Sequence, residues 1–86
     1  MITSDDIKDI NPEALMIDGF DGAIIGMAER INLGPVVAYD IDAILQILIK
    51  RDNMTYEEAY EFFNYNIIGA WMGENTPIFI TKIINL

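Results

Sequence analysis

Two aspartates flank a glycine turn early in the chain, in the segment Asp18-Gly19-Phe20-Asp21. Carboxylate oxygens are the ligands that Mg²⁺ and Ca²⁺ prefer in proteins, so Asp18 and Asp21, joined in space by Asp40, would form a candidate cation site. The spacing is not that of an EF-hand loop. Aspartate side chains also commonly bond backbone amides within turns, and the sequence favours this second interpretation.

The pair Tyr39-Asp40 stands where an expected strand meets an expected helix. A carboxylate and a phenol at such a point have the chemistry for proton transfer. Aspartate is also a strong helix N-cap that contributes about 1 kcal/mol, and we favour that interpretation. The chain has no histidine and no cysteine, so one copy cannot build a catalytic triad, a Cys/His nucleophile or a thiolate or imidazole metal site. We therefore expect no enzymatic activity and no cofactor.

Three glutamates, Glu57, Glu58 and Glu61, gather in the first turns of an expected helix. They predict either a patch for a basic partner or a solvated helix face. The aromatic content of the same helix is larger than one face can bury. Phe62 and Tyr65 are therefore expected to point off the core stripe, toward a subunit interface or a partner.

The only tryptophan, Trp71, lies among small residues in the segment 69–77, which also carries Glu74. Small neighbours permit close backbone approach, and tryptophan is a frequent interface anchor. The alternative is that Trp71 closes the end of the core beneath this segment. The sequence leaves both interpretations open.

The composition combines a short chain with a large apolar fraction. The chain has 86 residues, of which 52% are hydrophobic, and its mean hydropathy is +0.26. A single small domain lacks the interior volume for so many large side chains. We therefore expect a homo-oligomer, a protein partner, or both.

The net charge of −9 argues against direct nucleic-acid binding and against binding to an anionic membrane. It permits a basic partner, a divalent cation or mimicry of a nucleic acid, and it also serves solubility. The N-terminus lacks the basic and apolar regions of a signal peptide, and no apolar run approaches the roughly 20 residues of a membrane span. A cytoplasmic protein is expected.

Residues 1–11 are expected to form an acidic arm or a short helix begun at Thr3 or Ser4, and residues 12–86 a single α+β domain. Asn11-Pro12-Glu13 has the pattern of a helix start, because asparagine caps and proline fits the first helical position. Gly19 would end this helix after one or two turns.

A hairpin and a helical pair are expected next. Two β-rich runs over residues 23–29 and 35–39 predict antiparallel strands, with the turn at residues 32–35. After Asp40, helical spacing predicts an apolar face formed by Ile41, Ile44, Leu45, Leu48 and Ile49. Thr55 with Glu58 has the form of a capping box for a second helix, whose expected apolar stripe is Tyr56, Ala59, Tyr60, Phe63 and Ile67.

A last strand is predicted over residues 78–84. The resulting order, β-β-α-α-β, predicts an α+β fold in which a small, mostly antiparallel three-stranded sheet packs against a helical hairpin.

Several short motifs, in this order and spacing, resemble a small protein family that is common in tailed bacteriophages and prophages. The likeness runs from Ala14 to Phe79, and its motifs are Asp18-Gly19-Phe20-Asp21-Gly22, Ile24-Ile25-Gly26, Tyr39-Asp40, Met54-Thr55, Glu57-Glu58-Ala59, Gly69-Ala70-Trp71, Gly73-Glu74 and Thr76-Pro77. The resemblance implies a phage setting, a compact α+β fold and no particular reaction.

The leading hypothesis is a small, acidic, phage-encoded interaction protein in the host cytoplasm. It would bind itself or a host or phage protein through aromatic and acidic surface, as a host-factor inhibitor or an assembly accessory. One alternative is a cation-dependent enzyme or cation-binding module that uses Asp18, Asp21 and Asp40. Another is a nucleic-acid mimic, which the apolar richness fits poorly.

Overall fold

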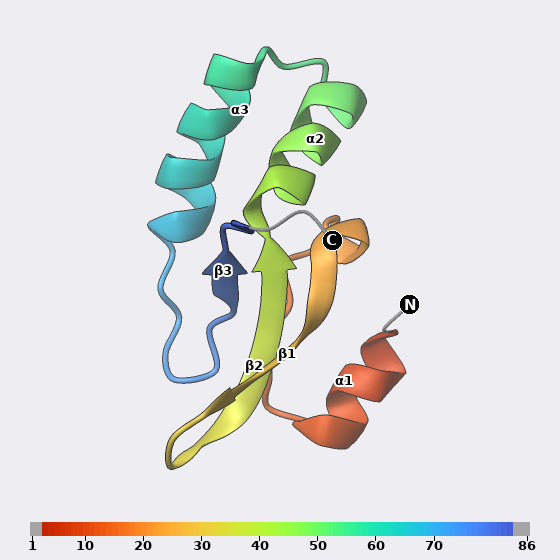
Figure 1. The fold of residues 1–86 in the computed structure, drawn as a ribbon, viewed down its shortest axis with the longest axis vertical. Helices are drawn as coiled ribbons and strands as arrows, with labels where there is room; N and C mark the ends of the chain where they lie inside the picture. Colours follow the sequence, from red (N-terminus) through yellow and green to blue (C-terminus); the bar gives the residue numbers. More distant parts are fainter. Residues whose placement is uncertain (1–2, 84–86) are drawn as a thin grey trace.

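The computed structural model describes residues 3–83, which form one mixed sheet and a set of helices (Figure 1). The molecule is elongated, with extents of 38 × 28 × 24 Å. Its elements, in chain order, are α1 (Ser4–Ile10), the 3₁₀ turn η1 (Asp21–Ala23), β1 (Ile24–Arg30), β2 (Leu33–Asp40), α2 (Ile41–Arg51), α3 (Tyr56–Phe62), the π-helical turn η2 (Phe63–Ile68) and β3 (Ile78–Ile80). The predicted α+β class and the β-β-α-α-β order are confirmed.

The three strands lie side by side in the order β1-β2-β3. β1 pairs antiparallel with β2, whereas β3 pairs with β2 in parallel, over Ile78–Ile80. The parallel pairing follows from the path of the chain. The α2–α3 hairpin rises beyond the end of β2, and residues 69–77 then return to the start of β3 (Figure 1).

The hairpin turn is tighter than the sequence predicts. Only Ile31 and Asn32 separate the two strands, and Asn32 has a φ of 61°, a left-handed conformation that asparagine tolerates. The expected turn at residues 32–35 is therefore wrong, and Pro35 lies within β2. Proline is accommodated there because β3 pairs only with Ala38, Tyr39 and Asp40 and because the register of β1 and β2 shifts beside Pro35.

Both helices of the hairpin are capped at their N-termini as predicted. The backbone N–H of Asp42 donates to the Asp40 side chain at the start of α2. Thr55 and Glu58 form a complete capping box at the start of α3. Between the helices, Asn53 takes a left-handed φ of 57°, so a tight connection turns the chain back on itself.

The first part of the chain differs from the expectation at one helix. Thr3 caps α1 through a capping box with Asp6, so the short-helix alternative holds for this segment. Asn11 begins only a single turn, in which its carbonyl oxygen accepts from the Ala14 N–H at 3.1 Å, and no helix follows. The side chain of Asn11 has one tertiary and one local partner. Its Nδ2 donates to the carbonyl oxygen of Pro35 at 2.7 Å, and its Oδ1 accepts from the Glu13 N–H at 3.0 Å. A Cβ atom at Gly34 would lie 3.1 Å from Asn11 Nδ2, so glycine permits this close approach.

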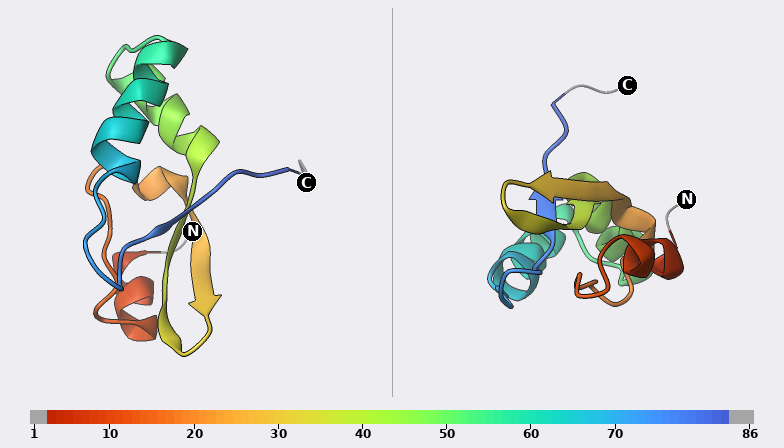
Figure 2. Two further views of the ribbon diagram at one scale, coloured as in Figure 1. Left: turned by 90° about the vertical axis from the view of Figure 1, so that its left-hand side faces the viewer. Right: turned by 90° about the horizontal axis from the view of Figure 1, so that it is seen from below.

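The core lies on one face of the sheet, the face on which both α1 and α3 lie (Figure 2). Ile7 of α1 is fully buried and belongs to this core. On α2, the predicted face is confirmed by the buried Ile44, Leu45 and Leu48. At the centre, Tyr39 stacks on Phe79 with ring centroids 5.9 Å apart, and Phe63 meets the same ring edge-on at 5.6 Å.

The last strand is shorter than predicted, because pairing stops at Ile80. Residues 81–83 leave the sheet and project from the side opposite α1 and α3 (Figure 2). The remaining residue of the predicted strand, Ile84, lies outside the described residues. Within residues 3–83, no helix is long and apolar enough to cross a bilayer.

Candidate interaction surfaces

The end of the helical hairpin exposes a run of large apolar side chains. Tyr65 is 82% exposed and Trp71 is 75% exposed. We call the exposed apolar side chains of this segment the 62–72 surface; its members are Phe62, Tyr65, Ile68, Trp71 and Met72. No charged residue lies between residues 62 and 72. An exposed run of apolar and aromatic side chains without charge is typical of a protein interface.

The helix geometry explains why these side chains point outward. Ala59, Phe63 and Ile67 are buried, four residues apart on the side that packs on the core. Phe62 and Tyr65 therefore fall off that stripe, as the sequence predicts for both. η2 winds as a π-helical turn, and the chain leaves the helix at Gly69. The interaction role predicted for Phe62 and Tyr65 stays a prediction.

Trp71 is exposed and does not close the core, so that alternative is wrong. The loop that carries it is nevertheless tied down on both sides. Thr76 Oγ1 accepts from the Met72 N–H at 2.8 Å, and the Leu15 N–H donates to the Asn75 carbonyl oxygen at 3.1 Å. Arg30 reaches from the end of β1 to the carbonyl oxygen of Glu74. A loop that is already ordered loses little conformational entropy when its tryptophan binds another molecule.

A hollow of about 220 Å³ lies beside this loop. Four segments line it: the chain before η1, the end of η2, the loop and β3. The lining residues are Met16, Ile17, Asp18, Asn66, Ile67, Ala70, Met72, Thr76, Pro77 and Phe79. Met72 belongs both to the hollow and to the 62–72 surface. The hollow is therefore continuous with that surface, and its mostly apolar lining suits an apolar side chain.

The predicted acidic residues are all on the surface. Glu57, Glu58, Glu61 and Glu74 are exposed. Glu58 Oε1 accepts from the Thr55 N–H at 2.9 Å, so this carboxylate serves the helix cap. Glu57 and Glu61 lie instead beside the tyrosines of α3, where all four residues line one shallow hollow.

Those tyrosines contradict the expected apolar stripe. Tyr56 is 57% exposed and Tyr60 is 48% exposed, and the two rings stack with centroids 6.2 Å apart. The buried side of the helix is the row of Ala59, Phe63 and Ile67, four residues apart. Tyr56 and Tyr60 form a second row beside it and therefore lie at the edge of the core and in contact with solvent.

The candidate cation ligands do not gather. Asp18 and Asp21 are exposed while Asp40 is buried, and within residues 3–83 no three Asp, Glu, His or Cys side chains are placed to hold a metal ion. The Asp40 carboxylate has other partners, because it accepts from the Asp42 N–H at 3.3 Å and pairs with Lys82 Nζ at 3.2 Å. Its predicted role as a helix cap is confirmed.

Tyr39 and Asp40 also do not act together. Consecutive residues of a strand point to opposite faces, and Tyr39 is buried in the core. Its hydroxyl oxygen accepts from the Ile17 N–H at 2.8 Å. Burial raises the pKa of Tyr39, and the nearby charge of Asp21 raises it further against the opposing effect of the Ile17 hydrogen bond. A phenol with a raised pKa is a poor proton donor at neutral pH, so the geometry does not favour proton transfer.

No family model, curated protein or solved structure matches this chain. The phage resemblance therefore stays a prediction from the sequence. Lys82, the ion-pair partner of Asp40, is a surface residue that sequence reasoning missed. The available signal was that Lys82 is the single basic residue of the chain after Arg51, in an otherwise uncharged C-terminal run.

Proposed function

We propose that this chain is a small protein-interaction protein that self-associates through the 62–72 surface. The observation that carries the proposal is the exposure of Trp71 and Tyr65 on an anchored loop and helix end. Tryptophan and tyrosine supply much of the binding energy of protein interfaces, and an ordered loop presents them with little entropic loss.

The absence of charge from this surface makes it the place where a second copy can bind. Two chains that each carry a net charge of −9 repel one another over most of their surface. The 62–72 surface is uncharged, so it is where two copies meet with the least repulsion. In a two-fold dimer the same surface serves both subunits, and Trp71 of one copy would lie over the hollow beside Met72 of the other.

Exposed acidic residues outside this surface would face away from the interface between the two copies. Glu57, Glu61 and Glu74 are exposed and would remain in contact with solvent or with a basic host or phage protein. The resemblance in sequence supports a phage-encoded protein in the host cytoplasm, acting as a host-factor inhibitor or an assembly accessory. An acidic, self-associating protein of this kind needs neither a catalytic set nor a cofactor.

A matched pair of tyrosines on the same helix tests the proposal. Trp71→Ala is expected to weaken self-association about 30-fold or more, and Tyr65→Ala about tenfold, as for interface anchors. Tyr56→Ala removes an equally large exposed ring outside the 62–72 surface and is expected to leave self-association unchanged. Sedimentation velocity over a concentration series measures all three. Equal dissociation constants for Tyr65→Ala, Tyr56→Ala and the unmodified chain would contradict the proposal.

A further inference from the structure

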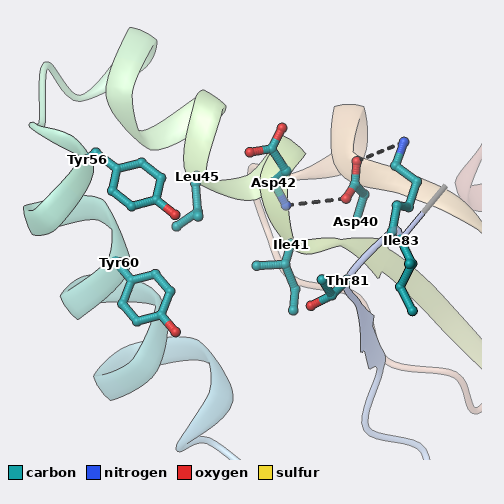
Figure 3. Close-up of a pocket in the computed structure, with 9 residues that line it drawn as sticks. Asp40, Ile41, Asp42, Leu45, Tyr56, Tyr60, Thr81 and Ile83 are labelled. Carbon is teal, nitrogen blue, oxygen red and sulfur yellow. Dashed lines mark hydrogen bonds and ion pairs between the residues drawn. The ribbon is translucent and has the colours of Figure 1, made fainter. Parts of the chain in front are cut away.

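A groove of about 610 Å³ runs between the helical hairpin and the residues that follow β3 (Figure 3). It is lined by Asp40, Ile41, Asp42, Leu45, Tyr56, Tyr60, Thr81, Lys82 and Ile83. Its residues lie outside the 62–72 surface, so an inference about it does not depend on self-association through that surface. The groove combines an apolar floor, two aromatic rings and carboxylates, which is an unusual set for solvent contact alone.

The two tyrosines form one wall. Both rings extend from α3 toward α2, where Leu45 and Ile41 lie (Figure 3). On their other side, Glu57 and Glu61 line a second hollow of about 510 Å³ with the same two rings. The paired rings therefore stand between Asp42 on one flank and two glutamates on the other. Aromatic faces and carboxylates both attract a cation, the first through the ring quadrupole and the second through charge.

The protein's own lysine already occupies the acidic end of this groove. Lys82 Nζ lies 3.2 Å from Asp40 Oδ2, although the Lys82 side chain remains 51% exposed. An ammonium group is thus accommodated among the groove residues. Asp42 is exposed and makes no ion pair with the residues that the structure describes, so its charge is available to a second cation.

We propose that this groove binds an arginine-bearing, basic segment of a partner protein. The aliphatic stem of arginine fits the floor of Ile41 and Leu45, and its planar guanidinium both stacks on tyrosine and bonds a carboxylate. Charge complementarity selects this occupant, because a chain with a net charge of −9 attracts a cationic segment and repels nucleic acid.

A capped peptide of alternating leucine and arginine is the probe, and the same peptide with citrulline is its control. Citrulline keeps the shape of arginine but has no charge. NMR titration of the amide groups is expected to show shifts on α2 from residue 41 to 45 and on α3, with the citrulline peptide binding about fivefold to tenfold more weakly.

Variants then separate the contributing groups. Tyr60→Leu keeps an apolar side chain but removes the ring, and it is expected to weaken arginine-peptide binding about twofold to fivefold. Tyr60→Phe keeps the ring and is expected to retain this binding. Asp42→Asn is expected to weaken binding by a similar factor. Circular dichroism checks the fold of each variant, and because these side chains are exposed none is expected to unfold the protein.

Two outcomes would overturn the inference: equal binding of the arginine and citrulline peptides, or amide shifts confined to residues 62–72. Trp71→Ala distinguishes this inference from the proposed function. It is expected to weaken self-association about 30-fold or more and leave peptide binding unchanged. A chain that dimerises but does not bind the arginine peptide contradicts the groove alone, and a monomer that binds it contradicts the proposed function alone.

Discussion

Replacing Tyr39 by phenylalanine removes one hydroxyl group from the centre of the fold. The ring of Tyr39 is fully buried and stacks on Phe79, and phenylalanine retains that packing. The lost oxygen is the acceptor for the Ile17 N–H, at 2.8 Å. Ile17 lines the hollow beside the 62–72 surface, so this hydrogen bond links the sheet to the proposed interface.

The expected loss of stability at neutral pH follows from that single bond. A net hydrogen bond contributes about 0.5–1.5 kcal/mol, and leaving a partly buried N–H without a partner adds a desolvation penalty. We expect Tyr39→Phe to lower the free energy of unfolding by about 1–2 kcal/mol near pH 7.

The pH dependence has a definite sign. Burial raises the pKa of Tyr39 in the folded protein, whereas in the unfolded chain tyrosine titrates at about pH 10. Below that pH both states keep the proton, and the contribution of Tyr39 is constant. Above it the unfolded state loses its proton first, so stability falls as pH rises until the folded pKa is passed. Phenylalanine has no such proton. The difference in the free energy of unfolding between the unmodified chain and Tyr39→Phe therefore narrows above about pH 10.

Urea denaturation followed by far-UV circular dichroism, at about pH 7 and about pH 11, measures both effects. Tyr65→Phe is the matched control, because Tyr65 is largely exposed and the substitution is expected to change little at either pH. The reasoning fails if Tyr39→Phe is as stable as the unmodified chain at neutral pH, or if the difference between them stays constant at alkaline pH.

Three further substitutions test the packing that presents the 62–72 surface. Phe63→Ala is expected to lower the free energy of unfolding by about 3–5 kcal/mol, because Phe63 is buried. Phe62 is 36% exposed, so Phe62→Ala is expected to lower it by less, about 1–2 kcal/mol. Thermal denaturation compares the two variants, and equal losses would contradict the assigned helix face. Asn11→Ala removes the hydrogen bond to Pro35 and a weaker contact to Asn75. Urea denaturation is expected to show a free energy of unfolding lower by about 1–2 kcal/mol, and self-association is expected to weaken. An unchanged unfolding midpoint would contradict the stabilising role of these contacts.

The sequence predicted the features that depend only on residues close together in the chain, namely the helix caps and the buried face of α2. Asp40 and Thr55 were identifiable as N-caps because a cap depends on the few residues that follow it. The face of α2 was identifiable because its apolar spacing has one dominant period. These elements fix the β-β-α-α-β order, and the fold class follows from that order.

The missed features depend on residues far apart in sequence. Asn11 has the pattern of a helix cap and does accept from the Glu13 N–H, but the turn does not continue as a helix. Its Nδ2 also donates to the carbonyl oxygen of Pro35 on β2, a tertiary contact that no local pattern indicates. Pro35 predicts a turn, yet it is accommodated inside a strand because its neighbour strand is short.

The candidate interaction surfaces were predictable only where they depend on local sequence. Helical periodicity alone indicated that Phe62 and Tyr65 leave the core stripe. It could not indicate that Tyr56 and Tyr60 do so as well, because these tyrosines and Ala59 both fit a stripe of helical spacing, and the packing of α3 in the fold selects which row is buried. The pairing of Lys82 with Asp40 was likewise not visible, since it requires the parallel docking of β3.

The most direct test of the central claim is a concentration series of the unmodified chain by sedimentation equilibrium, with fluorescence of its single tryptophan recorded on the same samples. Self-association through the 62–72 surface predicts a mass that rises with concentration to at least twice the 9.7 kDa of one chain, accompanied by a blue shift as Trp71 leaves water. A mass of 9.7 kDa from micromolar to millimolar concentration, with an unchanged emission spectrum, would contradict it.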